Sequence, residues 1–319
     1  MLNFSWDTYA VQVSDDDMIL GAPVSMVLMS DSLLSIYDAR KDNYIWWLNV
    51  NNGTYSSCLH RGEGPNESFG VNNISLMDGD LFVSSSQDNK LFRISIDADS
   101  LSSTINTLGT AKTDVLKGVM ISDDEIIYAP FFEDSVRFVS AKISGEVVDT
   151  IGRLDFIAGE GDFVPRNSLA PFSMAVSKDR DVMVASNLGW NIIEVFDLIH
   201  NNSIMLKGPI EIESKVKMIE TPFGRTAKQS PRWEMFRNPS VSEDGFDVGY
   251  IGVKIATSDD LNKKISSILC FDATGHPTKQ LVLDEEILCY AIDYDTMTMY
   301  FVPTDGNPVV KKLLLSDKT

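Results

Sequence analysis

Hydrophobic residues fall into short runs of four to nine residues, rich in Val, Ile, Leu, Phe and Tyr, along the whole chain. The runs are separated by turns of Asp, Asn, Gly and Ser, a pattern typical of β-strands. No window keeps the 3.6-residue apolar period of a helix over a useful length, and the nearest, around residues 211–219, is short and charged. The pattern therefore predicts an all-β protein with little helix.

The predicted strands recur in groups of four. The groups begin near residues 24, 71, 115, 171, 236 and 288, so six units of about 53 residues fill the chain, the fifth being the least regular. This repeat is typical of a β-propeller, in which each four-stranded antiparallel sheet, or blade, packs between its neighbours. We predict one six-bladed propeller domain over residues 1–319. Two β-sandwich domains are the alternative, but they predict neither six similar units nor a spare strand.

The ends of the chain supply a test of this fold. The last unit offers only three strands, at residues 289–294, 297–303 and 309–316, whereas residues 8–13 near the N-terminus form a spare one. We predict that residues 1–20 carry a closing strand that completes the last blade.

A glycine-rich run follows the first unit, where residues 59–69 read Leu-His-Arg-Gly-Glu-Gly-Pro-Asn-Glu-Ser-Phe. This run resembles the Gly-x-Gly-Pro-Gly-Glu-Phe run of the six-bladed, TolB-like and NHL-like propellers of Bacteroides-type bacteria. Asn66 stands where that family often has Gly, and Ser68 intervenes before the Phe. The resemblance implies the fold and an exported, often lipid-anchored, location, but little chemistry. It is specific at four positions: Gly62, Gly64, Pro65 and Glu67.

Charge narrows the class of partner. The chain has 27 Lys and Arg against 46 Asp and Glu, a formal net charge of −19. Nucleic-acid binding needs basic residues facing phosphate, so this balance excludes it. The longest nearly uncharged apolar stretch, residues 18–29, is interrupted by Gly21 and Pro23 and is shorter than the roughly 20 residues of a membrane helix. We therefore expect no transmembrane segment. We also expect the protein to be a monomer.

The N-terminal residues lack the basic and apolar regions of a secretory signal. With the resemblance, this leads us to expect a periplasmic or surface lipoprotein whose signal is absent from this sequence, and a cytoplasmic location is the alternative. The three cysteines are odd in number and lack CxxC spacing, which predicts buried thiols rather than a zinc site or disulfide framework. A bridge between Cys270 and Cys289 is the one pairing left open.

Catalytic motifs are weak in this sequence. Gly62-Glu-Gly64 and Gly159-Glu-Gly161 lack the third glycine of a phosphate loop and open no predicted helix. With three histidines in the chain, a Ser-His-Asp triad is not expected. The acidic clusters at residues 15–17, 123–125 and 259–260 lack the rhythm of a calcium loop and are interpreted as solvated turns.

Loop length points to a candidate binding face. In a propeller, all connections from one blade to the next leave on the same face, and the longest here, residues 60–70, 153–170 and 207–235, are of that kind. They contain nine basic and nine acidic residues, so the whole net charge lies elsewhere. Binding sites are enriched in arginine and aromatic side chains, although these aromatics could instead pack between blades. The candidate ligand-binding residues are Arg61, Phe131, Phe132, Arg166, Trp190, Arg225 and Trp233.

These observations predict a non-catalytic propeller without a cofactor, which binds a small molecule, a glycan or a protein at its loop-rich face. The alternative is a lactonase or arylesterase of the gluconolactonase type, which holds calcium at the central channel with Glu, Asn and Asp side chains. Asn73, Asn187 and Asp293 are the candidate calcium ligands by residue type.

Overall fold

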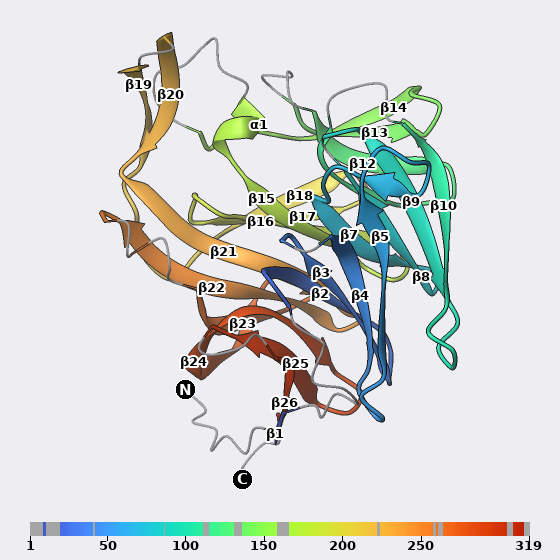
Figure 1. Cartoon of the computed structure of the whole chain (residues 1–319). Coiled ribbons are helices and arrows are strands. Elements are labelled where there is room, and N and C mark those ends of the chain that lie inside the picture. Colours follow the sequence, from blue (N-terminus) through green and yellow to red (C-terminus); the bar gives the residue numbers. More distant parts are fainter. Residues whose placement is uncertain are drawn as a thin grey trace. The chain divides into compact units, whose positions relative to one another are not determined.

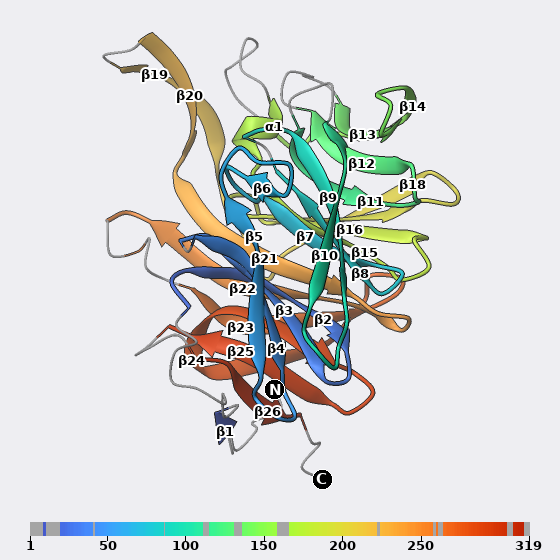
Figure 2. The same cartoon turned by 45° about the vertical axis from the view of Figure 1, so that its right-hand side comes forward.

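A computed structural model describes residues 9–10, 20–40, 42–85, 87–110, 115–130, 136–157, 166–221, 224–257, 260, 264–304 and 309–315. Figures 1 and 2 show the whole chain, which divides into two compact units. Unit 1 comprises residues 1–110, 264–268 and 279–319, and unit 2 comprises residues 111–263 and 269–278. A single domain over residues 1–319 stays a prediction.

Unit 1 begins with two antiparallel meanders, in which strands adjacent in sequence are neighbours in the sheet. The first contains β2 (Pro23–Ser30), β3 (Leu33–Asp38), β4 (Asn43–Asn49) and β5 (Tyr55–Arg61), with the short β6 (Glu67–Ser68) pairing parallel to β5. The second contains β7 (Asn73–Met77), β8 (Asp80–Ser84), β9 (Lys90–Ile96) and β10 (Ser103–Thr110). This order matches propeller blades and not the Greek-key order of β-sandwiches.

The last sheet of unit 1 closes with the N-terminal strand, as predicted. β24 (Pro277–Asp293) pairs with β25 (Thr298–Pro303), which pairs with β26 (Lys311–Leu314). β1 (Tyr9–Ala10) then pairs antiparallel with β26, with Tyr9 opposite Lys312 and Ala10 opposite Lys311. Strand β23 (Ile265–Asp272) precedes β24 in the chain.

Unit 2 contains two further meanders. The first is formed by β11 (Val115–Met120), β12 (Glu125–Pro130), β13 (Val136–Lys142) and β14 (Val147–Arg153). The second is formed by β15 (Phe172–Val176), β16 (Val182–Asn187), β17 (Ile192–Asp197) and β18 (Asn202–Lys207). Two antiparallel hairpins follow: β19 (Lys215–Thr221) with β20 (Gly224–Ser230), and β21 (Arg232–Val241) with β22 (Gly245–Ile255).

The cores of unit 1 lie between consecutive sheets. One cluster joins side chains of the β2–β5 sheet, such as Trp47, to side chains of the β7–β10 sheet, such as Phe92. A second joins Leu34 and Leu48 of the β2–β5 sheet to Cys289 and Val302 of the closing sheet. The first and last sheets of the chain therefore pack together, as ring closure requires.

Unit 2 is built in the same way. A cluster that includes Phe138 and Phe172 joins the β11–β14 sheet to the β15–β18 sheet. Another, with Val195 and Phe236, joins the latter sheet to the β21–β22 hairpin. Apolar side chains on both faces of a sheet are thus buried against its neighbours, which explains why the strands read as nearly continuous apolar runs.

The helix prediction is confirmed for the described part of the chain, whose single α-helix is the four-residue α1 (Arg166–Leu169). No helix among those residues is long and apolar enough to span a bilayer. The described segments correct one loop assignment, because residues 207–235 contain the β19–β20 hairpin. The hairpin extends away from β21 in both views (Figures 1 and 2).

None of the three cysteines forms a disulfide, so the open question of a Cys270–Cys289 bridge is answered in the negative. All three are buried. Burial raises the pKa of Cys58 to about 11 and also raises the pKa of Cys289, which keeps both protonated at neutral pH.

Candidate functional site

The glycine-rich run forms a compact loop between the first two sheets of unit 1, which we call the Arg61–Gly70 loop. Backbone bonds hold it closed, from the Gly62 N–H to the Ser68 carbonyl and from the Glu67 N–H to the Gly64 carbonyl. The parallel pairing of β6 with β5 places Ser68 opposite Arg61. A connection that sequence reasoning treated as open loop is therefore ordered by its own backbone.

Glu67 explains the spacing of the two glycines. Its carboxylate accepts a hydrogen bond of 2.8 Å from the Gly64 N–H and lies where a side chain on residue 62 or 64 would have to sit. A Cβ at Gly62 would overlap the Glu67 carboxylate, and one at Gly64 would come within 3.0 Å of it. Two glycines and one glutamate thus form one structural element, which is the part of the run that resembles the known propellers.

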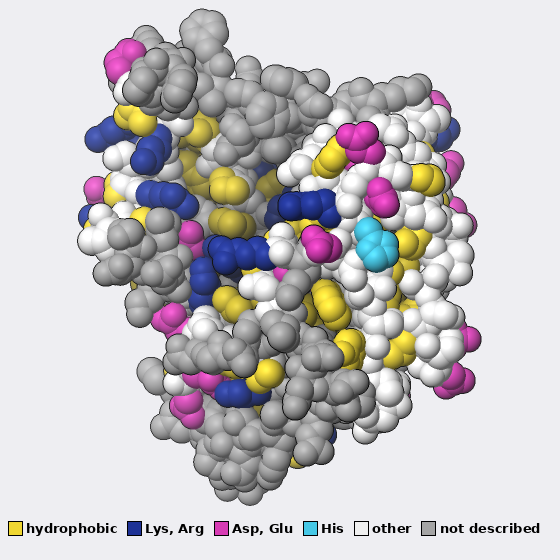
Figure 3. Space-filling model, viewed as in Figure 1, with side chains coloured by type: hydrophobic (Ala, Val, Ile, Leu, Met, Phe, Trp, Pro, Cys, Tyr) yellow, Lys and Arg dark blue, Asp and Glu magenta, His cyan; other side chains and the backbone are white. Residues whose placement is uncertain are grey.

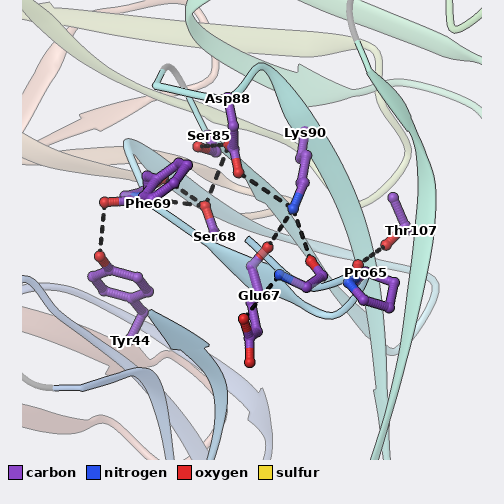
Figure 4. Close-up of polar contacts among 11 residues, drawn as sticks. Tyr44, Pro65, Glu67, Ser68, Phe69, Ser85, Asp88, Lys90 and Thr107 are labelled. Atoms are coloured by element: carbon purple, nitrogen blue, oxygen red, sulfur yellow. Dashed lines mark hydrogen bonds and ion pairs between the residues drawn. The ribbon is translucent and has the colours of Figure 1, made fainter. Parts of the chain in front are cut away.

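Lys90 ties this loop to the second sheet (Figure 4). Its ammonium donates to the carbonyls of Gly64 and Glu67 at 2.9 and 2.8 Å and lies 3.6 Å from the Asp88 carboxylate. Figure 4 also shows the Thr107 hydroxyl donating to the Pro65 carbonyl, at 2.6 Å. The loop is therefore anchored from β9 and β10 as well as from β5.

Tyr44 of β4 joins the two ends of the Arg61–Gly70 loop. Its buried hydroxyl donates to the Phe69 carbonyl at 2.8 Å and accepts from Arg61 Nε at 2.8 Å. The Arg61 guanidinium also lies 5.8 Å from the centre of the Tyr44 ring. Phe69 is 40% exposed. The predicted residue Arg61 is thus held beside an exposed phenylalanine that the sequence did not single out.

Both long insertions of unit 2 meet in one apolar cluster. Val216 of the β19–β20 hairpin packs with Leu154, Ile157 and Trp190. Trp190 is only 5% exposed, and its ring nitrogen donates to the Leu169 carbonyl at 2.9 Å. Trp190 is therefore a core residue that joins two insertions, because its indole has both an apolar cavity and an acceptor within reach.

The remaining candidates have different placements. Trp233 is half-buried on β21 against the cluster that contains Phe236. Phe131 and Phe132 lie outside the described residues, while Arg166 and Arg225 are described in their backbone alone, at the start of α1 and on β20. Their role in ligand binding stays a prediction.

Residues 4–295 match the sequence profile of the family described as TolB-like 6-blade propeller-like. The chain belongs to this TolB-like propeller family. No curated protein matches it in sequence.

Solved structures support the same fold for this TolB-like propeller. A candidate exported protein of Bacteroides fragilis NCTC 9343 is 10% identical with a TM-score of 0.60, over 97% of this chain and 94% of that one. A DUF4221 family member of Bacteroides vulgatus ATCC 8482 is 10% identical with a TM-score of 0.59, over 98% and 96%. The RRP9 WD40 repeats are 11% identical with a TM-score of 0.53, over 97% and 98%. At these identities the likeness shows the propeller fold alone.

The candidate calcium ligands of this TolB-like propeller do not occupy equivalent places in their sheets. Asn73 opens β7 opposite Ser84, and Asn187 closes β16 opposite Phe172, so both lie at the open end of a first hairpin. Asp293 instead lies at the turn between β24 and β25. Its carboxylate caps that turn by accepting from the N–H groups of Asp295 and Thr296.

Asn187 belongs to a buried network around Arg137, which sequence reasoning missed. Arg137 Nε and Nη2 both lie 2.9 Å from Glu194 Oε2, and Nη2 also donates to Asn187 Oδ1 at 3.1 Å. Nη1 donates to Asn167 Oδ1 and to the Ala170 carbonyl. Within Val-Arg-Phe-Val-Ser, an arginine that alternates with apolar residues looks solvent-facing, so the strand pattern gave no signal of its burial.

Proposed function

We propose that this protein is a non-catalytic binding propeller, and that the Arg61–Gly70 loop binds an acidic glycan. The observation that carries the proposal is the arrangement of Arg61 and Phe69 around Tyr44. One hydrogen bond from Arg61 Nε fixes the guanidinium, and in the described part of the chain no bond engages its two terminal nitrogens. Those nitrogens can receive a carboxylate in a bidentate manner.

Phe69 supplies the second half of such a site. Its half-exposed ring can pack against the apolar face of a sugar, while the hydrogen bond from the Tyr44 hydroxyl holds the backbone of Phe69 in place. The network of Lys90, Glu67 and Thr107 orders the loop before a ligand arrives, which lowers the entropy cost of binding. Preorganised arginine and aromatic side chains are typical of binding hot spots.

The experiment uses a short oligogalacturonate as the acidic probe and a cello-oligosaccharide of equal length as the neutral one, with titration calorimetry. We expect saturable binding of the acidic probe, and a loss of at least about tenfold with Arg61→Ala or Phe69→Ala, as for hot-spot residues. Arg153→Ala is the matched control, because Arg153 is an exposed arginine of unit 2 paired with Asp155. Equal affinities of Arg61→Ala and Arg153→Ala, or no saturable binding, would contradict the proposal.

A further inference from the structure

Lys117 of β11 is a cation without a counter-charge among the described residues. Its side chain is half-buried, and its ammonium lies 6.0 Å from the centre of the Phe172 ring on β15. No hydrogen bond or ion pair engages it in the described segments. Burial and, secondarily, the positive charge of Arg237 lower the pKa of Lys117 to about 8. The environment therefore disfavours the ammonium unless a negative charge joins it.

The charge of Arg237 on β21 acts on Lys117, and Arg237 and its chain neighbour Asn238 both carry buried donors. Arg237 Nη2 bonds Glu234 at 2.9 Å, but its Nε is buried without an acceptor in the described chain. The side-chain nitrogen of Asn238 is also buried without a partner there. Buried donors without acceptors are rare in native proteins and indicate a missing partner.

The strands that carry Lys117 and Asn238 both have irregular pairing at these residues. The pairing of β11 with β12 shifts register between Val115 and Gly118, the segment that contains Lys117. The pairing of β21 with β22 shifts between Arg237 and Ser240, where Asn238 has a positive φ of 49°. Bulges of this kind redirect side chains, and they are frequent beside binding sites.

Among the described residues around Lys117 and Arg237, the ion pairs leave an excess of positive charge, in a chain whose net charge is −19. Glu234 is shared between Arg237 and Arg232, whose Nη2 lies 3.6 Å from it, so one carboxylate faces two arginines and leaves Lys117 uncompensated. On the face shown in Figure 3, Lys and Arg side chains gather over β20 and β21. Concentrated positive charge of this kind raises the local concentration of anions.

We propose that Lys117, Arg237 and Asn238 form a binding site for a tetrahedral oxyanion, the phosphate or sulfate group of a ligand. A tetrahedral dianion accepts hydrogen bonds from several directions and carries the counter-charge that Lys117 lacks among the described residues. The site goes beyond the proposed glycan function, and it lies on a different unit from the Arg61–Gly70 loop.

The test uses inorganic phosphate and inorganic sulfate, titrated separately at constant ionic strength with chloride as the balancing anion. We expect one saturable site per chain and at least about tenfold weaker binding in Lys117→Met. Lys142→Met is the matched control, because Lys142 is an exposed lysine of the same unit. Preference for one anion identifies its group as the natural one. No saturable site, or equal affinity in Lys117→Met and wild type, would overturn the proposal.

Protection of the lysine gives a second readout that needs no variant. Acetylation of Lys117, measured by mass spectrometry at pH 8, is expected to slow when phosphate or sulfate is bound, while acetylation of Lys142 keeps its rate. Equal rates at Lys117 with and without the anion would overturn the proposal. Arg61→Ala should leave oxyanion binding unchanged, so failure of this site and failure of the glycan site are distinguishable.

Discussion

Two cations of unit 2 lie against the same aromatic ring and have opposite surroundings. The Arg137 guanidinium lies 4.4 Å from the centre of the Phe172 ring, and the Lys117 ammonium lies 6.0 Å from it. Arg137 has a carboxylate, two amide oxygens and a backbone carbonyl as partners, whereas Lys117 has none in the described segments. A satisfied buried cation holds sheets together, while an unsatisfied one is available to a ligand.

The largest expected effect is on the satisfied member of this pair. Arg137→Met should lower the free energy of unfolding by about 3–5 kcal/mol, because it leaves Glu194 buried without a cation. Denaturant unfolding measures the change. The double variant Arg137→Met/Glu194→Met should recover part of the loss; a double variant no more stable than the single one would contradict this account.

Lys117→Met should change the free energy of unfolding in the opposite direction. Removing an uncompensated ammonium should raise the free energy of unfolding by about 1 kcal/mol at pH 7, as measured by denaturant unfolding. The pKa of Lys117 is about 8 in the folded protein against its ordinary value of 10.5, so the unfolded state binds the proton more tightly. The contribution of Lys117 to stability therefore rises as pH increases from about 8 to 10.5.

Lys117→Met should lack this rise in the free energy of unfolding with pH. Arg237 is the charged group that acts on Lys117. Other groups also titrate at high pH: the pKa values of Tyr37 and Cys58 are raised to about 12 and 11, so both residues destabilise the fold as pH increases. The informative quantity is therefore the difference between wild type and Lys117→Met at each pH. A difference that stays constant from pH 7 to pH 10 would show that Lys117 is not desolvated.

Arg61 lies between these extremes, because its guanidinium makes one hydrogen bond within the described segments. Tyr44→Phe should lower the free energy of unfolding by about 1 kcal/mol, because the Phe69 carbonyl and Arg61 each lose a hydrogen bond. The same change should weaken oligogalacturonate binding less than Arg61→Ala does, since the charge remains. Calorimetry with both variants ranks them, and the reverse ranking would show that Tyr44 acts on the ligand itself.

Calcium should have the smallest effect on stability. Asn187 Oδ1 accepts from Arg137, and the Asp293 carboxylate caps its own turn, so the side-chain oxygens of both residues already accept hydrogen bonds. Addition of calcium or of a chelator should move the melting temperature by less than about 1 °C. A reversible rise with calcium would instead favour the lactonase alternative.

Much of the architecture could be predicted from sequence because propeller blades are local meanders. Strands adjacent in the chain pair with each other, so apolar runs and turns indicate the sheets directly, and the closing of the last blade by the N-terminal strand follows from counting strands. The family and its Bacteroides neighbours could be anticipated from Gly62, Gly64 and Glu67, which are fixed by one local contact.

The site residues depend on partners distant in sequence, and there the pattern carries less information. Trp190 was expected at a binding surface, yet its cavity is built by Leu154 and Val216 from two separate insertions. Arg137 has the spacing of a solvent-facing residue, although Glu194 and Asn187 enclose it. These long-range partners do not affect the local alternation of apolar and polar residues, so the pattern cannot reveal them.

Two buried thiols of unit 1 can report how often the packing between its sheets opens. Cys58 belongs to the cluster between the first and second sheets, and Cys289 belongs to the cluster between the first and last sheets. Each can react with a thiol reagent only when its own interface opens, because burial keeps it protonated and covered. The labelling rate of Cys289 therefore reports how often the first and last sheets separate, and the rate of Cys58 reports the same for the first and second sheets.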